Sequence, residues 1–370
     1  MNGPSSPLRE IFQKVQDRKR LSFEDGVRLF ESTDILTIGR MAHQVRERMY
    51  GRRVFHARNL HLNPTNICST RCEFCAFSRD ASAPDAYTLK LEEIEQRVRE
   101  ATNRWQINEV HIVGGHNPEL GFDYYEEMVR RIHHIKVGRP PLEKGSDPLF
   151  IKAFSAPEID FMAKQSGLSS ADVLRRLKEA GLDGMPGGGA EIFDPCVRER
   201  ICPKKISGEE WLKIHRTAHE IGIRTNATML YGHVETAQQR VAHLLKLREL
   251  QDETQGFCAF VPLPYHPGKH APAGVEGSSG FLDLKVLSIS RLLLDNVPHI
   301  KAHGAATNLK FVEVALSFGV DDAGGTNLRE NVMREAGSRA PEGLSSEDLI
   351  RCIKDAGFKP CLVDSSYQIK

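Results

Sequence analysis

Three closely spaced cysteines are the residues of this sequence best suited to chemistry. Cys68, Cys72 and Cys75 follow a strand-like run at residues 56–63 with the spacing C-x3-C-x2-C. Thiolates this close can share one inorganic centre, and three of them leave one position of a tetrahedral or cubane site open. The spacing therefore predicts an iron–sulfur cluster with one iron free to bind a small molecule. An incomplete zinc site is an alternative, whereas three buried structural thiols are disfavoured because residues 69–71 are polar.

Glycines follow two further strand-like runs, first as a pair and then as a triplet. They are Gly114, Gly115, Gly187, Gly188 and Gly189. A glycine has no Cβ, so its backbone can approach a ligand closely. We expect both stretches to contact a ligand bound at the cysteine loop, although a tight strand-to-helix turn would also explain the pair.

Carboxylates and histidines also occur where predicted strands end. Ser155 and Glu158 follow one strand, and Glu191 follows the glycine triplet. A carboxylate there can accept hydrogen bonds from ribose hydroxyls or an ammonium group, or it can simply cap a helix. His233 and His266 follow two later strands and are candidate proton-transfer groups, because imidazole titrates near neutral pH. A hydrogen-bonded structural role is the alternative for both histidines.

The elements that must position these residues alternate in type from residue 56 onward. Short apolar runs are followed by longer amphipathic segments, a pattern that predicts an α/β fold with a parallel sheet. Six clear βα units and two weaker ones favour a (β/α)8 or slightly open parallel barrel, and the core is near the roughly 250 residues typical of that fold. A doubly wound open sheet is disfavoured because no dinucleotide-binding fingerprint follows the first strand.

Three regions are expected along the chain. Residues 1–55 read as an N-terminal helical extension, with Ser22 as a helix N-cap. Residues 56–297 would form the barrel core, and residues 298–370 would add βα units that complete or cap it. A Gly- and Pro-rich connection at residues 136–148 is predicted to be a surface insertion.

Composition narrows the class of protein. The 370 residues include 50 basic and 49 acidic side chains, a net charge of +1, which argues against nucleic acid as the main partner. No run approaches the about 18 apolar residues of a membrane-spanning helix, and the first residues lack a signal-peptide core. Eight cysteines are too few for a disulfide scaffold of this length, so we expect a reducing, cytoplasmic location.

The cysteine loop resembles the signature of radical S-adenosylmethionine (radical SAM) enzymes. In that superfamily three thiolates hold a [4Fe–4S] cluster, and the methionine moiety of S-adenosylmethionine chelates the fourth iron. More narrowly, nearly the whole chain resembles the aminodeoxyfutalosine synthase family of the futalosine route to menaquinone. The stretches that carry this resemblance are residues 61–68, 151–159, 187–194, 228–233, 247–254 and 290–299.

The resemblance implies a radical transferase. A 5′-deoxyadenosyl radical, formed from S-adenosylmethionine, would add to the vinyl-ether carbon of 3-[(1-carboxyvinyl)oxy]benzoate. Aryl migration and decarboxylation would then give 6-amino-6-deoxyfutalosine, so S-adenosylmethionine would be a consumed cosubstrate. A low-potential electron donor such as flavodoxin or ferredoxin is the implied partner.

The same resemblance implies roles for individual residues. Cys68, Cys72 and Cys75 would hold the cluster. Gly114, Gly115, Ser155 and Glu158 would contact S-adenosylmethionine. The stretch from Gly187 to Glu191 would contact either that molecule or the aromatic substrate. Glu191 and His233 are the predicted catalytic residues, and the candidate partners of the benzoate, which the sequence does not rank, are Arg224, Tyr231 and His233.

One departure from the family pattern bears on the site. The family commonly has Gly-Leu-His-Pro after the second strand, whereas this chain has Gly115-His116-Asn117-Pro118. The histidine is shifted by one position, which puts in doubt any proton-transfer role of the family histidine. Three alternatives to the synthase stay open: the related dehypoxanthine futalosine cyclase, which abstracts hydrogen, the deazaflavin-forming synthases, and a zinc-binding interaction module.

Overall fold

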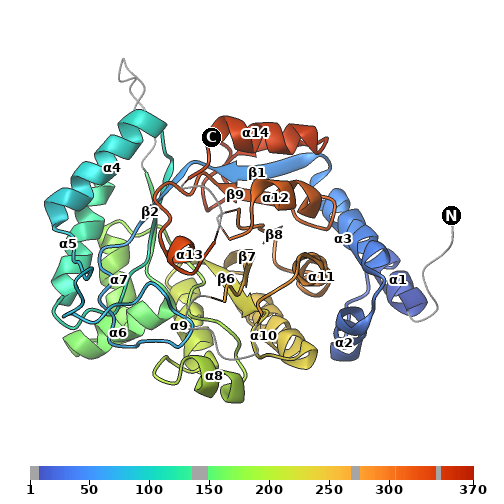
Figure 1. The fold of residues 1–370 in the computed structure, drawn as a ribbon, viewed down its shortest axis with the longest axis horizontal. Helices are drawn as coiled ribbons and strands as arrows, with labels where there is room; N and C mark the ends of the chain where they lie inside the picture. Colours follow the sequence, from blue (N-terminus) through green and yellow to red (C-terminus); the bar gives the residue numbers. More distant parts are fainter. Residues whose placement is uncertain (1–7, 136–148, 268–275, 305, 339–342) are drawn as a thin grey trace.

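A ring of parallel strands occupies the centre of the molecule, and helices cover its outside (Figure 1). This computed structural model describes the chain except for residues 1–7, 136–148, 268–275, 305 and 339–342. The predicted surface insertion at 136–148 lies outside the described residues.

Seven strands form the main sheet, and each pairs in parallel with the next along the chain. They are β2 (Asn59–Leu62), β3 (Glu109–Ile112), β4 (Phe150–Ala153), β5 (Gly184–Met185), β6 (Arg224–Tyr231), β7 (Phe257–Pro264) and β8 (His299–Ile300). Strictly sequential parallel pairing requires a crossover helix between successive strands, which is the connectivity that the alternating sequence pattern predicts.

An eighth strand, β9 (Asp322–Gly325), lies between the two edges of this sheet and closes the ring. On one side, the amide of Ala302, just past β8, donates to the carbonyl of Asp322 at 2.9 Å. On the other side, the amide of His61 in β2 donates to the carbonyl of Leu328 at 2.8 Å. The predicted (β/α)8-type barrel is therefore confirmed.

A small second sheet flanks the closure. It has the order β10–β1–β9, with β1 at Arg53–Ala57 and β10 at Lys359–Leu362, and both pairings are parallel. The sequence predicted neither β10 nor the division of the first strand into β1 and β2.

The helices fall into an N-terminal group and a group that alternates with the strands. The first group is α1 (Arg9–Gln16), α2 (Phe23–Glu31) and α3 (Ile35–Tyr50), of which α3 packs on α11 and α2 packs on α10. The second group is α4 (Leu91–Trp105), α5 (Phe122–His133), α6 (Ala156–Ser166), α7 (Ser170–Ala180), α8 (Pro195–Ile201), α9 (Gly208–Glu220), α10 (Ala237–Thr254), α11 (Gly280–Leu293), α12 (Leu309–Ala315), α13 (Val332–Glu335) and α14 (Ser346–Asp355). Ser22 caps α2 through the amide of Asp25, as predicted, whereas α8 and α13 were not predicted.

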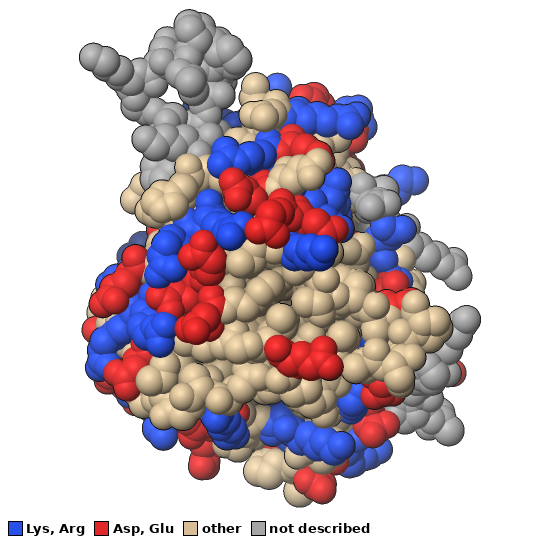
Figure 2. Space-filling view, turned by 90° about the vertical axis from the view of Figure 1, so that its left-hand side faces the viewer, with Lys and Arg blue, Asp and Glu red and all other residues tan. Residues whose placement is uncertain are grey.

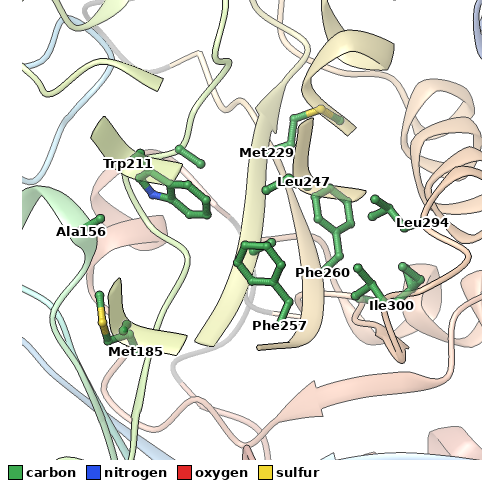
Figure 3. Packing of buried hydrophobic residues seen from close by; sticks show 14 of the residues in the cluster. Ala156, Met185, Trp211, Met229, Leu247, Phe257, Phe260, Leu294 and Ile300 are labelled. Carbon is green, nitrogen blue, oxygen red and sulfur yellow. The ribbon is translucent and has the colours of Figure 1, made fainter. Parts of the chain in front are cut away.

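Successive side chains of the barrel strands point to opposite faces of the sheet, and this alternation separates the apolar core from the cavity. In β6, Ala227 and Met229 are fully buried in the apolar core, whereas the intervening Asn226 and Thr228 line the inside of the barrel. Figure 3 shows the core on the outer side of the strands, where Phe257 and Phe260 lie with Trp211 of α9 and Leu247 of α10. The stability of the barrel therefore rests on its outer layer, which leaves the interior free to carry polar side chains.

The surface is mixed in charge. Figure 2 shows basic and acidic side chains interspersed on the left-hand face of the molecule, with no large area of one sign, as the net charge of +1 leads one to expect. Among the described residues, no helix has the length and apolar character needed to cross a bilayer.

Candidate active site

One cavity of about 310 Å³ runs from the cysteine loop into the interior of the barrel. Its wall includes ten of the predicted site residues, which come from the loops after four different strands: Cys68, Cys72, Cys75, Gly114, Gly115, Ser155, Glu158, Gly187, Gly188 and Gly189. Glu191 lines the same cavity, whereas His233 does not. Parallel strands bring their carboxyl ends to one rim, so residues far apart in the sequence meet there.

We call the rim the cysteine end, defined by Cys68, Cys72 and Cys75. Backbone hydrogen bonds hold the loop in place, since the amide of Cys68 donates to Arg79 at 3.0 Å and that of Ser69 donates to His116 at 3.0 Å. The loop is therefore held by two other segments of the chain, one at Arg79 and one at His116.

The three thiols fit a [4Fe–4S] cluster in their chemistry. All are free and partly exposed toward the cavity, and none of their sulfur atoms has a hydrogen-bond partner among the described residues. Burial raises the pKa of Cys72 to about 12, whereas the nearby charge of Lys205 lowers it; binding to iron would favour the thiolate further. No three His, Cys, Asp or Glu side chains of the described residues converge as ligands of a single ion; a cubane binds each thiolate through a separate iron.

A buried lysine beside the cluster loop was missed in the sequence. Lys205 donates to Glu191 at 2.7 Å, lies over the ring of Phe74 at 5.1 Å, and lines the cavity. Burial opposes its charge, but Cys72 and Glu191 outweigh that effect and raise the pKa of Lys205 well above its usual value. Lys205 follows helix α8, which the sequence did not predict, so no strand-end rule pointed to it.

The glycines are required mainly by the protein's own backbone. A Cβ on Gly115 would lie 2.1 Å from the carbonyl oxygen of Ile67, the residue before Cys68, and one on Gly187 would lie 2.6 Å from that of Asn226. Gly189 has φ +84° and packs on Pro157. These glycines let neighbouring loops approach one another, and contact with a ligand remains a prediction for all five.

Glu158 is held by hydrogen bonds from two loops. One oxygen accepts from the amide of Gly114 at 2.9 Å, and the other accepts from the amide of Ser155 at 2.8 Å and its hydroxyl at 2.6 Å. Burial raises the pKa of Glu158 to about 7 despite these three donors. The carboxylate therefore positions the Gly114 loop and completes the capping box of α6, so the helix-cap interpretation is confirmed. Contact of Glu158 with S-adenosylmethionine stays a prediction.

Other predicted residues lie away from the cavity. His233 receives the amide of Val234 on its own ring, lies 3.1 Å from Glu235, and belongs to a small apolar recess beside Phe74. Tyr231 points outward and donates to Asp283 at 2.9 Å, and Arg224 is exposed at the start of β6. Neither Arg224 nor Tyr231 lines the cavity: Tyr231 lies on the outer face of β6, and Arg224 lies at the exposed first position of the strand, away from the cysteine loop. The catalytic role of His233 stays a prediction without a cavity contact.

The shifted histidine has a structural explanation. Nδ1 of His116 lies 2.8 Å from the hydroxyl of Thr70 in the cysteine loop, and burial lowers the pKa of His116 to about 3. The amide of Asn117 is buried, bonds to Thr88 at 3.0 Å and does not line the cavity. His116 therefore supports the loop, and position 117 anchors the adjoining segment.

A second polar group lies deeper in the barrel, and we call it the histidine end. It consists of His61, His111 and His303 with the lysines Lys152 and Lys301, all of which line the cavity. His61, His111 and Lys152 are register partners on β2, β3 and β4. The rings of His61 and His111 stack at 4.6 Å, and that of His303 lies 6.3 Å from His61.

The lysines of the histidine end are already paired. Lys152 donates to Glu109 at 2.6 Å and to the hydroxyl of Ser365 at 2.6 Å, and Lys301 lies 3.1 Å from Asp322. None of these residues was assigned to the site from the sequence. Lys152 and Glu109 lie on strands, where the alternation of polar with apolar side chains was the available signal, whereas Lys301 directly follows β8.

Comparison with known proteins agrees with this site. Residues 62–247 match the radical SAM superfamily, and residues 254–370 match the CofH/MqnC C-terminal region. The aminodeoxyfutalosine synthase of Thermus thermophilus is 42% identical over 375 residues, covering 100% of this chain and 97% of the relative. The 5-amino-6-(D-ribitylamino)uracil–L-tyrosine 4-hydroxyphenyl transferase of Methanopyrus kandleri is 38% identical over 343 residues, covering 90% and 89%.

A solved structure shares the fold. The [FeFe]-hydrogenase maturase HydG superposes with a TM-score of 0.76 at 18% identity, over 99% of this chain and 77% of the maturase. The chain belongs to the radical SAM superfamily and, within it, to the aminodeoxyfutalosine synthase family. It is therefore an enzyme that uses a [4Fe–4S] cluster and S-adenosylmethionine, and the resemblance found in the sequence is confirmed.

Proposed function

We propose that this enzyme joins the adenosyl group of S-adenosylmethionine to 3-[(1-carboxyvinyl)oxy]benzoate, with aryl migration and loss of a carboxylate, to give 6-amino-6-deoxyfutalosine. The identity of 42% with an aminodeoxyfutalosine synthase over the whole chain carries the proposal. The proposal also includes a low-potential electron donor such as flavodoxin or ferredoxin and a cytoplasmic location, both supported by the redox chemistry of the superfamily.

The cysteine end would hold the reacting group. When bound there, the cluster supplies the electron that cleaves S-adenosylmethionine to methionine and a 5′-deoxyadenosyl radical. Cys68, Cys72 and Cys75 would hold the cluster, and the backbone at Gly114 would be presented to S-adenosylmethionine by its hydrogen bond to Glu158. Lys205 would hold the carboxylate of Glu191 in place beside the loop through their 2.7 Å contact.

The chain's apolar residues would protect the radical carbon. Helix α13 lies across the centre of the ring in Figure 1, and its Val332 and Met333 line the cavity together with Phe74 and Phe77 of the cysteine loop. A radical that must add to an alkene has to be kept from water and from other hydrogen donors. These four side chains offer no O–H or N–H group toward the cavity.

A product assay tests the proposal directly. The reconstituted enzyme is incubated anaerobically with dithionite, S-adenosylmethionine and the vinyl-ether benzoate, and the products are analysed by mass spectrometry. We expect an adduct that contains adenine. Free 5′-deoxyadenosine with unchanged benzoate would contradict adenosyl addition.

A parallel incubation tests the reaction of the second group of relatives. It contains 5-amino-6-(D-ribitylamino)uracil and L-tyrosine, the compounds in the name of the Methanopyrus relative. We expect no coupled product. A coupled product from this pair, together with none from the benzoate, would assign the chain to that transferase reaction instead.

A further inference from the structure

The histidine end has more nitrogen donors than the protein satisfies. Nδ1 of His303, Nδ2 of Asn327 and Nε2 of His266 are buried and have no hydrogen-bond partner in the described part of the chain, and all three residues line the cavity. The ring of His111 also lines the cavity and makes no hydrogen bond to a described residue. Unpaired buried donors destabilise a protein unless a ligand or water accepts from them. A group rich in acceptor oxygens would complement this wall.

The charges around these nitrogens cancel one another. Two buried lysines face two buried carboxylates, in the pairs Lys152–Glu109 and Lys301–Asp322. Burial lowers the pKa of His61 to about 3 and that of His303 to about 4, so the imidazoles are neutral when no ligand is bound. The protein groups of the histidine end are therefore electrically neutral as a set. A carboxylate that enters it brings one unbalanced negative charge into a buried site, which is costly unless a proton enters with it.

The position of the histidine end decides which carboxylate it suits. His61 lies on β2, before the cysteine loop, and His111 lies on β3, before Gly114, so both lie deeper in the barrel than the cluster loop. The third histidine, His303, follows β8 and lies 6.3 Å from His61 between ring centres. If the proposed function holds, the alkene of the substrate must lie toward the cysteine end, where the radical forms. The enol carboxylate is attached to the reacting carbon and is lost. The aryl carboxylate takes no part in the reaction and lies at the other end of the substrate.

We propose that His61, His111 and His303 form the subsite for the aryl carboxylate of the acceptor, and that this carboxylate binds together with one proton. The proposal rests on the proposed function. The proton is shared between the carboxylate and the imidazoles, where it converts a neutral pocket into an ion pair. The titratable and charged groups that face the three histidines are His266, Lys152, Lys301, Glu109 and Asp322.

Binding of an unreactive analogue tests the subsite without turnover. The probe is 3-(1-carboxyethoxy)benzoate, which lacks the alkene, and its partner carries a carboxamide in place of the aryl carboxylate. Calorimetry with the reconstituted enzyme and S-adenosylmethionine, without reductant, gives both dissociation constants. We expect the benzoate to bind at least about tenfold more tightly than the carboxamide at pH 7. Comparing buffers of different ionisation enthalpy should show uptake of about one proton for the benzoate only, with its dissociation constant rising about tenfold per pH unit.

Two substitutions locate the effect. His111→Leu and His303→Leu keep the volume of the side chain but remove its nitrogens, and each should abolish most of the preference for the carboxylate and the proton uptake. His243→Leu is the control, because the His243 side chain is also withdrawn from solvent but packs on Phe193 outside the cavity. Formation of 5′-deoxyadenosine without substrate reports whether the cysteine end of each variant is intact.

The outcomes separate the two proposals. A preference that survives in both leucine variants, or a wild-type enzyme that does not distinguish benzoate from carboxamide, overturns the subsite while the product assay still stands. A wild-type enzyme that binds neither analogue and forms no adduct overturns the proposed function together with the subsite. The wild-type comparison needs no variant, so the proposal stays testable even if a substituted chain fails to fold.

Discussion

The two ends of the cavity are built in different ways. The cysteine end consists of loops after the strands, held by backbone hydrogen bonds and close glycine contacts such as that of Gly115 with Ile67. Most of the histidine end consists of side chains on strands β2, β3 and β4, with Lys301 and His303 following β8. Buried ion pairs such as Lys152–Glu109 hold these side chains in place. Loops can be shaped to a cofactor without disturbing the core, whereas strand residues share the stability of the barrel. The comparison predicts that changes at the cysteine end remove chemistry and that changes at the histidine end also remove stability.

The largest effect is expected for Cys72→Ala. Loss of one of three thiolates should prevent cluster assembly, so that the reconstituted protein has no broad visible absorbance and forms no adduct. The stability of the metal-free protein should change little, because Cys72 makes no hydrogen bond through its sulfur among the described residues. Cys258→Ala is the control, since Cys258 is buried outside the cavity. A full complement of iron in the Cys72 variant would refute its assignment as a ligand.

A change at the histidine end should act on folding. Lys152→Met leaves the carboxylate of Glu109 buried without its partner, and removing one member of a buried pair costs about 3–5 kcal/mol of unfolding free energy. Denaturant unfolding measures the loss, and adding Glu109→Gln should restore part of it. Lys164→Met is the matched control, because Lys164 is 74% exposed and its pair with Asp160 is worth less than about 1 kcal/mol. Equal losses in the two lysine variants would show that burial of the Lys152–Glu109 pair adds nothing to the stability of the histidine end.

The sequence predicted the cysteine end more fully than the histidine end. Spacing identified Cys68, Cys72 and Cys75 because covalent geometry requires ligands of one cluster to be close, and short motifs carry that information. The barrel was predictable because alternating apolar runs reflect the burial of each strand. The closing strand β9 was only weakly indicated by the sequence, because Asp322–Gly325 contains two glycines, which are typical of loops, and no apolar run.

Residues that depend on tertiary packing could not be placed. Lys205 comes from the segment after a seven-residue helix and meets Glu191 only in the folded chain. His233 lies at a strand end, as predicted, but its ring enters a separate recess. The position of a residue in the sequence does not determine the direction of its side chain. His61 and His111 were within reach of the sequence, because they occupy alternate strand positions, yet their stacking depends on the register between β2 and β3.

Gly115→Ala tests how closely the loops of the cysteine end must approach. The new Cβ would lie 2.1 Å from the carbonyl oxygen of Ile67, so the backbone before Cys68 must shift. A displacement of about 1 Å at a reacting centre can cost about 100-fold in rate, and we expect adduct formation to fall by that factor with partial loss of iron. Gly121→Ala is the control, since its Cβ would meet no atom within 4 Å. An unchanged rate would show that the loop tolerates the shift and that the backbone of the cysteine end can move without loss of activity.

The smallest effect is expected from the titration of Glu158. It sharpens the comparison because this carboxyl group at the cysteine end forms no ion pair with any described residue, unlike the carboxylates of the histidine end. Burial raises its pKa to about 7 from an ordinary value of 4.5, so the folded protein binds more protons than the unfolded chain between these values. Stability contributed by protonated Glu158 is therefore lost as the pH rises through this window. Relative to Glu158→Gln, which stays neutral, the wild-type protein should lose about 1.5 kcal/mol of unfolding free energy between pH 5.5 and 7. Denaturant unfolding of both proteins at these two pH values measures the difference. A constant difference in unfolding free energy would mean that the hydrogen bonds from Gly114 and Ser155 already hold Glu158 ionised. The buried charge at the cysteine end would then be stabilised as fully as the buried charges of the histidine end.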